Sequence, residues 1–375
     1  MRTDPLSSLR RTLRFSRAWH APSRSLTSSE VLVPLPGGTE LIPGTSIRPE
    51  GSHDRVWVVL HGMTRPGRAH PELQRFVHAL ASAGVAVLVP EIREWMELDF
   101  APERAQAVIK ACVEWLESSS ETGVGGAVLV GFSFGAPQAL FAATDEQLAG
   151  KIHGVVGWGG YADIERTFRF SFTGVHEWEG TLHRQTPNPY ARWVIGKNCI
   201  PLSGSFASHI AVARALQRLA FEAGEGRIPV RGPAGDRFRK QLRGELPSAD
   251  RALFDVFAPE SSREPDPSAA EEVIDELVPA IRRALPLVEP IPLIHRLPVA
   301  TRLLHSRSDQ LIPFTETLRL GTVLEPLAPD LSTRLTGLFG HSGKHEPKGR
   351  WIRAKENLSF LQSLRGVFDL IDTEP

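Results

Sequence analysis

Ala127-Val128-Leu129-Val130-Gly131-Phe132-Ser133-Phe134-Gly135-Ala136 is the stretch that decides the fold. Its first four residues form an apolar run that predicts a buried strand, and the apolar residues 139–142 suit a helix packed on a sheet. Between them stands Gly-x-Ser-x-Gly, which predicts a tight strand-to-helix turn with Ser133 at its tip. A side chain at Gly131 or Gly135 would then collide with the neighbouring strand or helix.

Such a turn suits nucleophilic catalysis by Ser133. Its hydroxyl would stand at a helix N-terminus, where the partial charge of the helix and the free Phe134 N–H stabilise an oxyanion. The motif in this setting resembles the nucleophile elbow of the α/β-hydrolase superfamily. The resemblance implies a mostly parallel central sheet flanked by helices, and a Ser-Asp-His triad in that chain order. The alternative is an ordinary turn with an inert serine.

Short buried strands alternate with helices around this turn. The alternation implies βαβ units and a mostly parallel sheet, in which ligands gather at the carboxyl ends of the strands. The predicted elements are a hairpin (31–33 and 41–42), strands at 56–60, 85–89 and 152–156, and helices at 71–83 and 101–119.

His61-Gly62-Met63 follows the predicted strand 56–60 and therefore lies at such a carboxyl end. In the α/β-hydrolases, a His-Gly pair after the third strand opens the loop that supplies a second oxyanion donor. The resemblance thus implies that role for the backbone N–H of Met63. The alternative is that Gly62 only turns the chain after a strand.

The alternation stops after the sixth predicted strand. No buried strand is evident from about 165 to 297, where proline-rich joints separate predicted helices at 206–222, 236–242, 249–257 and 269–285. The resemblance implies that residues 166–298 are a mainly helical cap over the active site. The expected domains are a basic, flexible tail (1–30), a core (31–165 and 299–372) and this cap. Five aromatic residues could line an apolar pocket or equally form the core of the cap: Phe168, Phe170, Phe172, Trp178 and Trp193.

Asp309 follows the next predicted strand, 301–306, and a proline stands close behind it. The resemblance implies that this residue is the triad acid, whose carboxylate holds an imidazole in one tautomer and stabilises its charged form. An aspartate in front of Pro313 could instead only cap a helix. Asp163, just after the sixth strand, is the alternative acid.

His341 follows the last predicted strand, 333–338, and is the expected base. It lies in a glycine-flanked loop that can bring a side chain close to Ser133, whereas the competitor His345 lies farther into a loop with lysine and proline. Residues 351–371 are the predicted closing helix.

The order Ser133, Asp309, His341 predicts a serine hydrolase that cleaves a carboxylic ester through an acyl-enzyme. The expected substrate is a small-molecule ester or related acyl compound, and the mechanism requires no cofactor. Amide or peptide cleavage, acyl transfer by the same triad, and a hydrolase-like binding protein without activity are the alternatives.

The composition narrows the possible partners and cofactors. Lys+Arg and Asp+Glu both number 43, and this net charge of zero does not favour nucleic acid as a partner. Cys112 and Cys199 lack metal-site spacing, so buried free thiols and no metal site are expected. No stretch approaches the roughly 20 apolar residues of a membrane span.

The first 28 residues carry six arginines and a single acid. No continuous apolar region follows the basic residues, so a secretory signal is not expected and a cytoplasmic location is the prediction. Leu6, Leu9 and Leu13, with Phe15, could line one side of a short basic helix. The first interpretation is a flexible or loosely docked tail, with a membrane-surface helix or an organellar transit segment as alternatives.

Overall fold

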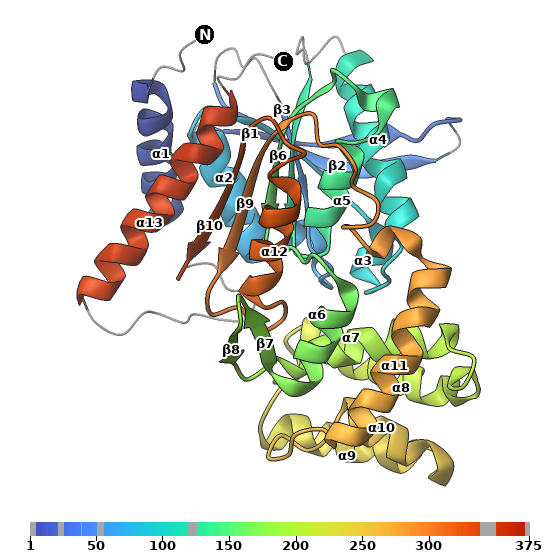
Figure 1. Ribbon diagram of the computed structural model, residues 1–375. Helices are drawn as coiled ribbons and strands as arrows, with labels where there is room; N and C mark the ends of the chain where they lie inside the picture. The colour runs from blue at the N-terminus through green and yellow to red at the C-terminus, as the bar shows by residue number, and fades with distance from the viewer. Residues whose placement is uncertain are drawn as a thin grey trace.

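The computed structural model describes residues 5–21, 26–38, 40–50, 56–118, 126–337 and 350–371. Eight strands form one sheet in the order β1-β2-β4-β3-β5-β6-β9-β10 (Figure 1). β2 is antiparallel to both of its neighbours, and the other pairs are parallel. The mostly parallel sheet predicted from the sequence is thus confirmed. Its strands are β1 (Thr27–Pro34), β2 (Leu41–Arg48), β3 (Val56–Leu60), β4 (Ala86–Pro90), β5 (Ala127–Phe132), β6 (Ile152–Trp158), β9 (Ala300–Ser306) and β10 (Leu331–Thr336).

Helices cover both faces of this sheet. In β3, Val56, Val58 and Leu60 belong to one apolar cluster, and Trp57 and Val59 belong to the other. Because side chains alternate between the faces of a strand, a strand buried on both faces is apolar throughout. The first cluster lies under α3 (Arg93–Met96), α4 (Pro102–Ser118), α5 (Gly135–Ala142) and α12 (Phe314–Leu324), and the second under α1 (Pro5–His20), α2 (Pro71–Ser82) and α13 (Arg350–Phe368).

A mainly helical insertion, residues 164–288, separates β6 from β9. It lies at the end of the sheet toward which the parallel strands point (Figure 1). Phe168, Phe172 and Trp193 are buried in its apolar core, and the Phe172 ring packs edge-on against Phe257. The insertion comprises α6 (Ile164–Thr173), the antiparallel hairpin of β7 (Val175–Trp178) and β8 (Thr181–Arg184), α7 (Pro189–Cys199), α8 (Ile210–Gly224), α9 (Pro233–Glu245), α10 (Arg251–Phe257) and α11 (Pro267–Ala284).

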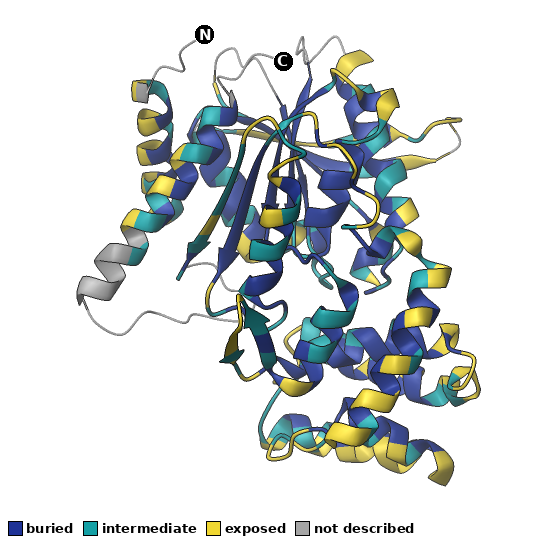
Figure 2. Cartoon of the chain, viewed as in Figure 1, coloured by how far each residue is buried: buried dark blue, intermediate teal, exposed yellow. Residues whose placement is uncertain are grey.

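Helix α1 lies against α2 and α13 at the edge of the molecule (Figure 1). Phe15 is fully buried and meets the rings of Phe76 and Phe368. The predicted grouping of Phe15 with the nearby leucines is wrong, because those leucines lie on the exposed side of the helix (Figure 2). Thr12, on the buried side, donates its hydroxyl to the Ser8 carbonyl at 2.8 Å, so this polar group needs no other partner.

Two further findings concern metals and membranes. Within the described ranges, no group of histidines, cysteines and carboxylates is arranged to hold a metal ion. No helix of the described residues is long and apolar enough to cross a bilayer. Cys112 and Cys199 are free and buried, and burial raises the pKa of the Cys112 thiol to about 12.

Candidate active site

Ser133 occupies the turn between β5 and α5 and has a backbone φ of 53°. This left-handed conformation is uncommon for a residue with a side chain and stores strain of about 1–3 kcal/mol. Hydrogen bonds hold the turn in place: the Ser133 N–H donates to the Trp158 carbonyl at 2.8 Å, and the Ala136 N–H donates to the Ser133 carbonyl at 3.0 Å. The strained serine is therefore fixed between a central strand and a helix.

The two glycines of the motif allow this close approach. A Cβ at Gly131 would lie 2.1 Å from the Gly135 carbonyl oxygen, and one at Gly135 would lie 3.3 Å from Leu60 Cβ. The predicted collision is confirmed at position 131, and position 135 is a tight contact. A strained serine between two such glycines, at the end of a central parallel strand, has the backbone geometry of the strand-to-helix turn that is typical of the α/β-hydrolase fold. The chain has the α/β-hydrolase fold.

The loop after β3 lies directly against Ser133, because a Cβ at Gly62 would come within 3.5 Å of Ser133 Cβ. Met63 follows in this loop. Phe134, which follows Ser133, is the N-cap residue of α5, and its ring packs against those of Phe100 and Trp95 at 5.3 and 5.7 Å between centroids. The two segments predicted to supply oxyanion donors therefore both adjoin the serine.

His61 organises the loop rather than transferring protons. Its Nε2 accepts a hydrogen bond from the Ile92 N–H at 3.1 Å, so the ring proton is on Nδ1, which donates to the Gly62 carbonyl at 2.9 Å. Burial lowers the pKa of His61 to about 4, and the ring is therefore neutral near pH 7. His61 thus links the loop after β3 to the loop after β4.

Asp309 lies in the loop after β9, with only 1% of its surface exposed. Its Oδ1 accepts hydrogen bonds from the Leu311 N–H at 2.9 Å and the Ile312 N–H at 3.2 Å. Its Oδ2 lies 3.4 Å from Nε2 of His305, which is also buried. The carboxylate is therefore held in one orientation by its own loop and by a strand residue.

The sheet register brings Ser133 and Asp309 to the same edge. Phe132 of β5 pairs with Trp158 of β6, which pairs with Leu304 of β9. The carboxyl ends of these strands are therefore level. His341 and its competitor His345 follow β10, the neighbour of β9, and both lie outside the described residues.

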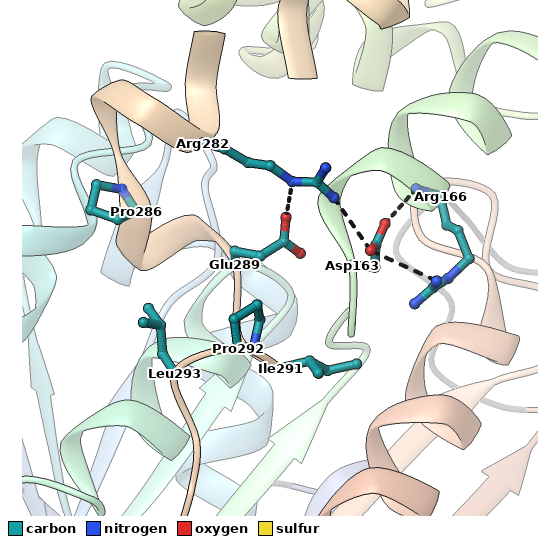
Figure 3. Close-up of a pocket in the computed structure, with 8 residues that line it drawn as sticks. All are labelled: Asp163, Arg166, Arg282, Pro286, Glu289, Ile291, Pro292 and Leu293. Atoms are coloured by element: carbon teal, nitrogen blue, oxygen red, sulfur yellow. Dashed lines mark hydrogen bonds and ion pairs between the residues drawn. The ribbon is translucent and has the colours of Figure 1, made fainter. Parts of the chain in front are cut away.

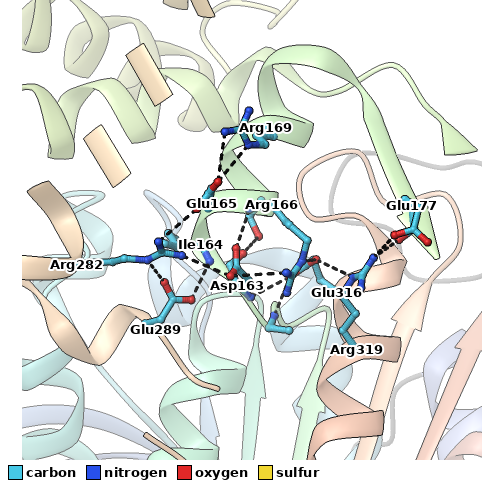
Figure 4. Close-up of polar contacts among 12 residues, drawn as sticks. Asp163, Ile164, Glu165, Arg166, Arg169, Glu177, Arg282, Glu289, Glu316 and Arg319 are labelled. Atoms are coloured by element: carbon cyan, nitrogen blue, oxygen red, sulfur yellow. Dashed lines mark hydrogen bonds and ion pairs between the residues drawn. The ribbon is translucent and has the colours of Figure 1, made fainter. Parts of the chain in front are cut away.

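Asp163 lies in the loop after β6 and caps α6 by accepting the Arg166 N–H at 2.8 Å. Its Oδ2 lies 3.4 Å from Arg282 and 3.7 Å from the Arg166 guanidinium. Figure 4 shows that it belongs to a chain of ion pairs at the junction of core and insertion. The alternative acid therefore has a structural role at this junction.

Glu316 of α12, which the sequence did not single out, supports the loop after β6. This buried carboxylate accepts the N–H groups of Ala162 at 3.1 Å and Asp163 at 2.9 Å, and it pairs with Arg166 Nε at 2.9 Å. Burial raises the pKa of Glu316 although Arg166 acts to lower it. These partners are more than a hundred residues away, so local sequence carries no signal for them.

Arg282, at the end of α11, contacts both segments through which the chain passes between the core and the insertion. It donates to Glu289 at 2.6 Å and lies 3.3 Å from Glu165 at the start of α6.

A cavity of about 440 Å³ opens beside these groups, and Ser133 is not among its lining residues (Figure 3). The cavity is lined by Asp163, Arg166, Arg282, Pro286, Glu289, Ile291, Pro292 and Leu293.

The insertion also contacts the loops that surround Ser133. Arg65, after β3, donates to Glu225 at 3.0 Å. Asn198 of α7 accepts the Phe100 N–H, after β4, at 3.2 Å. The Asn188 N–H donates to the Gln310 carbonyl, next to Asp309, at 2.7 Å. The insertion is thus attached to three loops at the carboxyl edge of the sheet.

No family model and no curated protein sequence matches this chain. Among solved structures, it is similar to the Pyrococcus furiosus esterase Pf2001, with 14% identity over 91% of this chain and 92% of the other, at a TM-score of 0.47. It is also similar to the Pyrococcus horikoshii acylaminoacyl peptidase, with 13% identity over 90% of this chain and 41% of the other, at a TM-score of 0.49. A third similar structure is Candida antarctica lipase A, with 12% identity over 84% of this chain and 73% of the other, at a TM-score of 0.45. Identities and TM-scores this low leave the reaction to be argued from the residues of the site.

Proposed function

We propose that the protein is a serine hydrolase that cleaves a carboxylic ester through an acyl-enzyme intermediate. The observation that carries the proposal is the backbone of Ser133, held at a φ of 53° between a central strand and α5 by the close packing of Gly131 and Gly135. A protein that needed only a turn here could use an unstrained residue. The strain is accounted for by a hydroxyl that must project from the edge of the sheet.

In the proposed reaction, His341 removes the Ser133 proton as the hydroxyl oxygen attacks the ester carbonyl. The backbone N–H groups of Phe134 and Met63 stabilise the oxyanion of the tetrahedral intermediate. This intermediate collapses, the carbon–oxygen bond to the alcohol breaks, and His341 returns the proton to the leaving alcohol. A water molecule then repeats the sequence on the acyl-enzyme, releases the acid and regenerates Ser133. Asp309 orients the imidazole and stabilises its charged form.

The strand order supports His341 as the base. β10 ends at Thr336, and three strand spacings separate β10 from β5 in the sheet. Three spacings amount to about 14 Å, whereas the five residues that lead to His341 can span up to about 17 Å when extended. An imidazole at this position can therefore reach the region between Ser133 and Asp309.

The insertion serves as a cap in this proposal. Its contacts with the loops after β3, β4 and β9 support a substrate site enclosed between the insertion and the edge of the sheet. Enclosure of this kind removes water and strengthens electrostatic stabilisation of the oxyanion. The substrate of the proposed reaction is a small-molecule ester.

The test compares Ser133→Ala with the parent protein on a short p-nitrophenyl ester and on a fluorophosphonate probe. Loss of the nucleophile is expected to lower kcat on the order of 10⁶-fold. It should also abolish labelling, with the probe found on the Ser133 peptide of the parent. Ser205→Ala, at an exposed position of the insertion, is the matched control and should behave as the parent.

Two results would contradict the proposal. Ser133→Ala could keep its activity and labelling, or the folded parent could fail to react with both reagents, as a non-catalytic binding protein would. Alanine variants at the two candidate bases extend the test. His341→Ala should be nearly inactive, and His345→Ala should keep most of the activity.

A further inference from the structure

Helix α1 presents leucines and arginines side by side on its outer face. Leu6, Leu9 and Leu13 are 59%, 42% and 57% exposed. Residues three and four positions apart lie on the same face of a helix, so these side chains form one apolar stripe. The exposed Arg10, Arg14 and Arg17 repeat at the same spacing and form a basic stripe next to it.

The opposite face of α1 fixes the direction in which these stripes point. Phe15 is fully buried between α2 and α13. Arg11 reaches the carbonyl oxygens of Ala83 and Gly84 at 3.5 and 3.4 Å. Arg75 donates to the Trp19 carbonyl at 2.8 Å. Because α1 is anchored along its inner side, the leucines and arginines point away from the protein, as the exposed turns of α1 in Figure 2 show.

We propose that this outer face of α1 docks the protein on the surface of a membrane that contains anionic phospholipids. The leucines would enter the boundary between head groups and acyl chains, where burial of each side chain is favourable. The guanidinium groups would stay at the head groups and bind phosphate oxygens. Helix α1 contains no aspartate or glutamate, so nothing within it opposes a negatively charged surface.

The charge pattern favours a lipid surface over a second copy of the chain. In a two-fold symmetric dimer with antiparallel α1 helices, the two arginine stripes would face each other and repel; with parallel helices, each arginine stripe would face leucines. In neither arrangement does α1 supply a carboxylate to pair with the arginines. A bilayer surface accepts the leucines and neutralises the arginines at the same time. The chain as a whole has a net charge of zero, so the attraction would be local to α1.

Co-sedimentation of the full chain with vesicles tests the proposal. Phosphatidylcholine vesicles are compared with vesicles that also contain phosphatidylglycerol, at low and high salt. The parent should bind the anionic vesicles, and salt should weaken the binding. Replacing Arg10, Arg14 and Arg17 together by glutamine should weaken binding on the order of 100-fold. Replacing Leu6, Leu9 and Leu13 together by serine should weaken it by at least about tenfold.

Matched controls separate this face from general effects of charge and hydrophobicity. Leu32, Leu41 and Leu182 are 57%, 51% and 70% exposed on strands elsewhere, and their triple serine variant removes the same number of exposed leucines. Arg218, Arg227 and Arg243 of the insertion, changed together to glutamine, alter the net charge equally. Both control variants should bind anionic vesicles as the parent does, and circular dichroism should show an intact fold for all variants.

The proposal is overturned if the parent does not bind anionic vesicles. It is also overturned if the α1 leucine variant binds them as tightly as the parent. A third result against it is a lipid-free dimer, seen by analytical ultracentrifugation, that the same leucine substitutions disperse. That result would identify a second copy of the chain as the partner of this face.

Discussion

Two loops at the carboxyl edge of the sheet each carry an aspartate, and the two carboxylates have different surroundings. Asp309, after β9, has a side chain that is 1% exposed, and backbone N–H groups of its own loop hold its Oδ1. Asp163, after β6, has a side chain that is 22% exposed and lies near Arg166 and Arg282. The other oxygen of Asp309, Oδ2, lies 3.4 Å from Nε2 of the buried His305.

In the proposed mechanism, the two aspartates serve different purposes. A carboxylate that serves a catalytic imidazole must keep its charge available for that ring, and backbone amides can orient it without neutralising it. The charge of Asp163 is already partly neutralised by the guanidinium groups of Arg166 and Arg282. The backbone N–H groups that orient Asp309 support the proposal that it is the triad acid, whereas Asp163 contributes ion pairs to the junction with the insertion.

Neutralising each carboxylate in turn is the most direct test of which aspartate acts as the acid. Asp309→Asn should lower kcat on the order of 10⁴-fold, because the amide favours the wrong imidazole tautomer. Asp163→Asn should stay within about tenfold of the parent, since asparagine still caps a helix. Steady-state kinetics on a p-nitrophenyl ester measure both. The reverse ranking would make Asp163 the acid.

Removal of Glu316 tests whether the loop after β6 depends on its charge network. Glu316→Ala would leave the N–H groups of Ala162 and Asp163 and the Arg166 guanidinium without their buried partner. The free energy of unfolding should fall by about 3 kcal/mol, as for other broken buried pairs. Urea denaturation measures this loss.

The matched control for Glu316 is Glu325→Ala, at the exposed end of the same helix. Its effect should remain below about 0.5 kcal/mol. Equal losses at the two positions would show that the network contributes nothing beyond an ordinary surface charge.

Acidification should lower stability through His61, by an amount similar to the loss expected for Glu316→Ala. Its folded-state pKa of about 4 lies below the ordinary value of 6.5, so only the unfolded chain takes up this proton as the pH falls from 6.5 toward 4. The contribution of His61 to stability is complete above about pH 6.5, and up to about 3 kcal/mol of it is lost by pH 4.

Unfolding free energies of the parent and of His61→Gln across this pH range test the assignment. The glutamine variant should be less stable at pH 7 but should lose less stability on acidification. Burial also lowers the pKa of His176 to about 4, so some pH dependence should persist in the variant. Identical slopes in the two proteins would show that His61 does not remain neutral in the fold.

Much of the fold could be predicted because its signals are local. The apolar run before Ser133, the two glycines around it and the alternation of strands and helices depend on residues close together in the chain. The predicted strands and helices of the core correspond to observed elements, apart from differences of a few residues at their ends. The position of Asp309 after a strand followed from the same alternation.

Helix α1 shows where local pattern fails. From the sequence, Leu6, Leu9 and Leu13 were grouped with Phe15 on one side of a short helix. The structure instead buries Phe15 and leaves the three leucines exposed. The buried face of α1 is set by the contacts of Phe15 with Phe76 and Phe368, which lie far along the chain. Hydrophobic periodicity cannot reveal such partners.

The sequence by itself determined the serine turn, the strands that lead to the carboxyl edge of the sheet and the order of the triad candidates, because steric limits on glycine and the two-residue period of strands act over short distances. Only the tertiary structure decided which carboxylate is surrounded by guanidinium groups, that the His61 ring stays neutral, and which face of α1 meets solvent. Electrostatic environment and burial are set by neighbours in space, and most of those neighbours are distant in the chain.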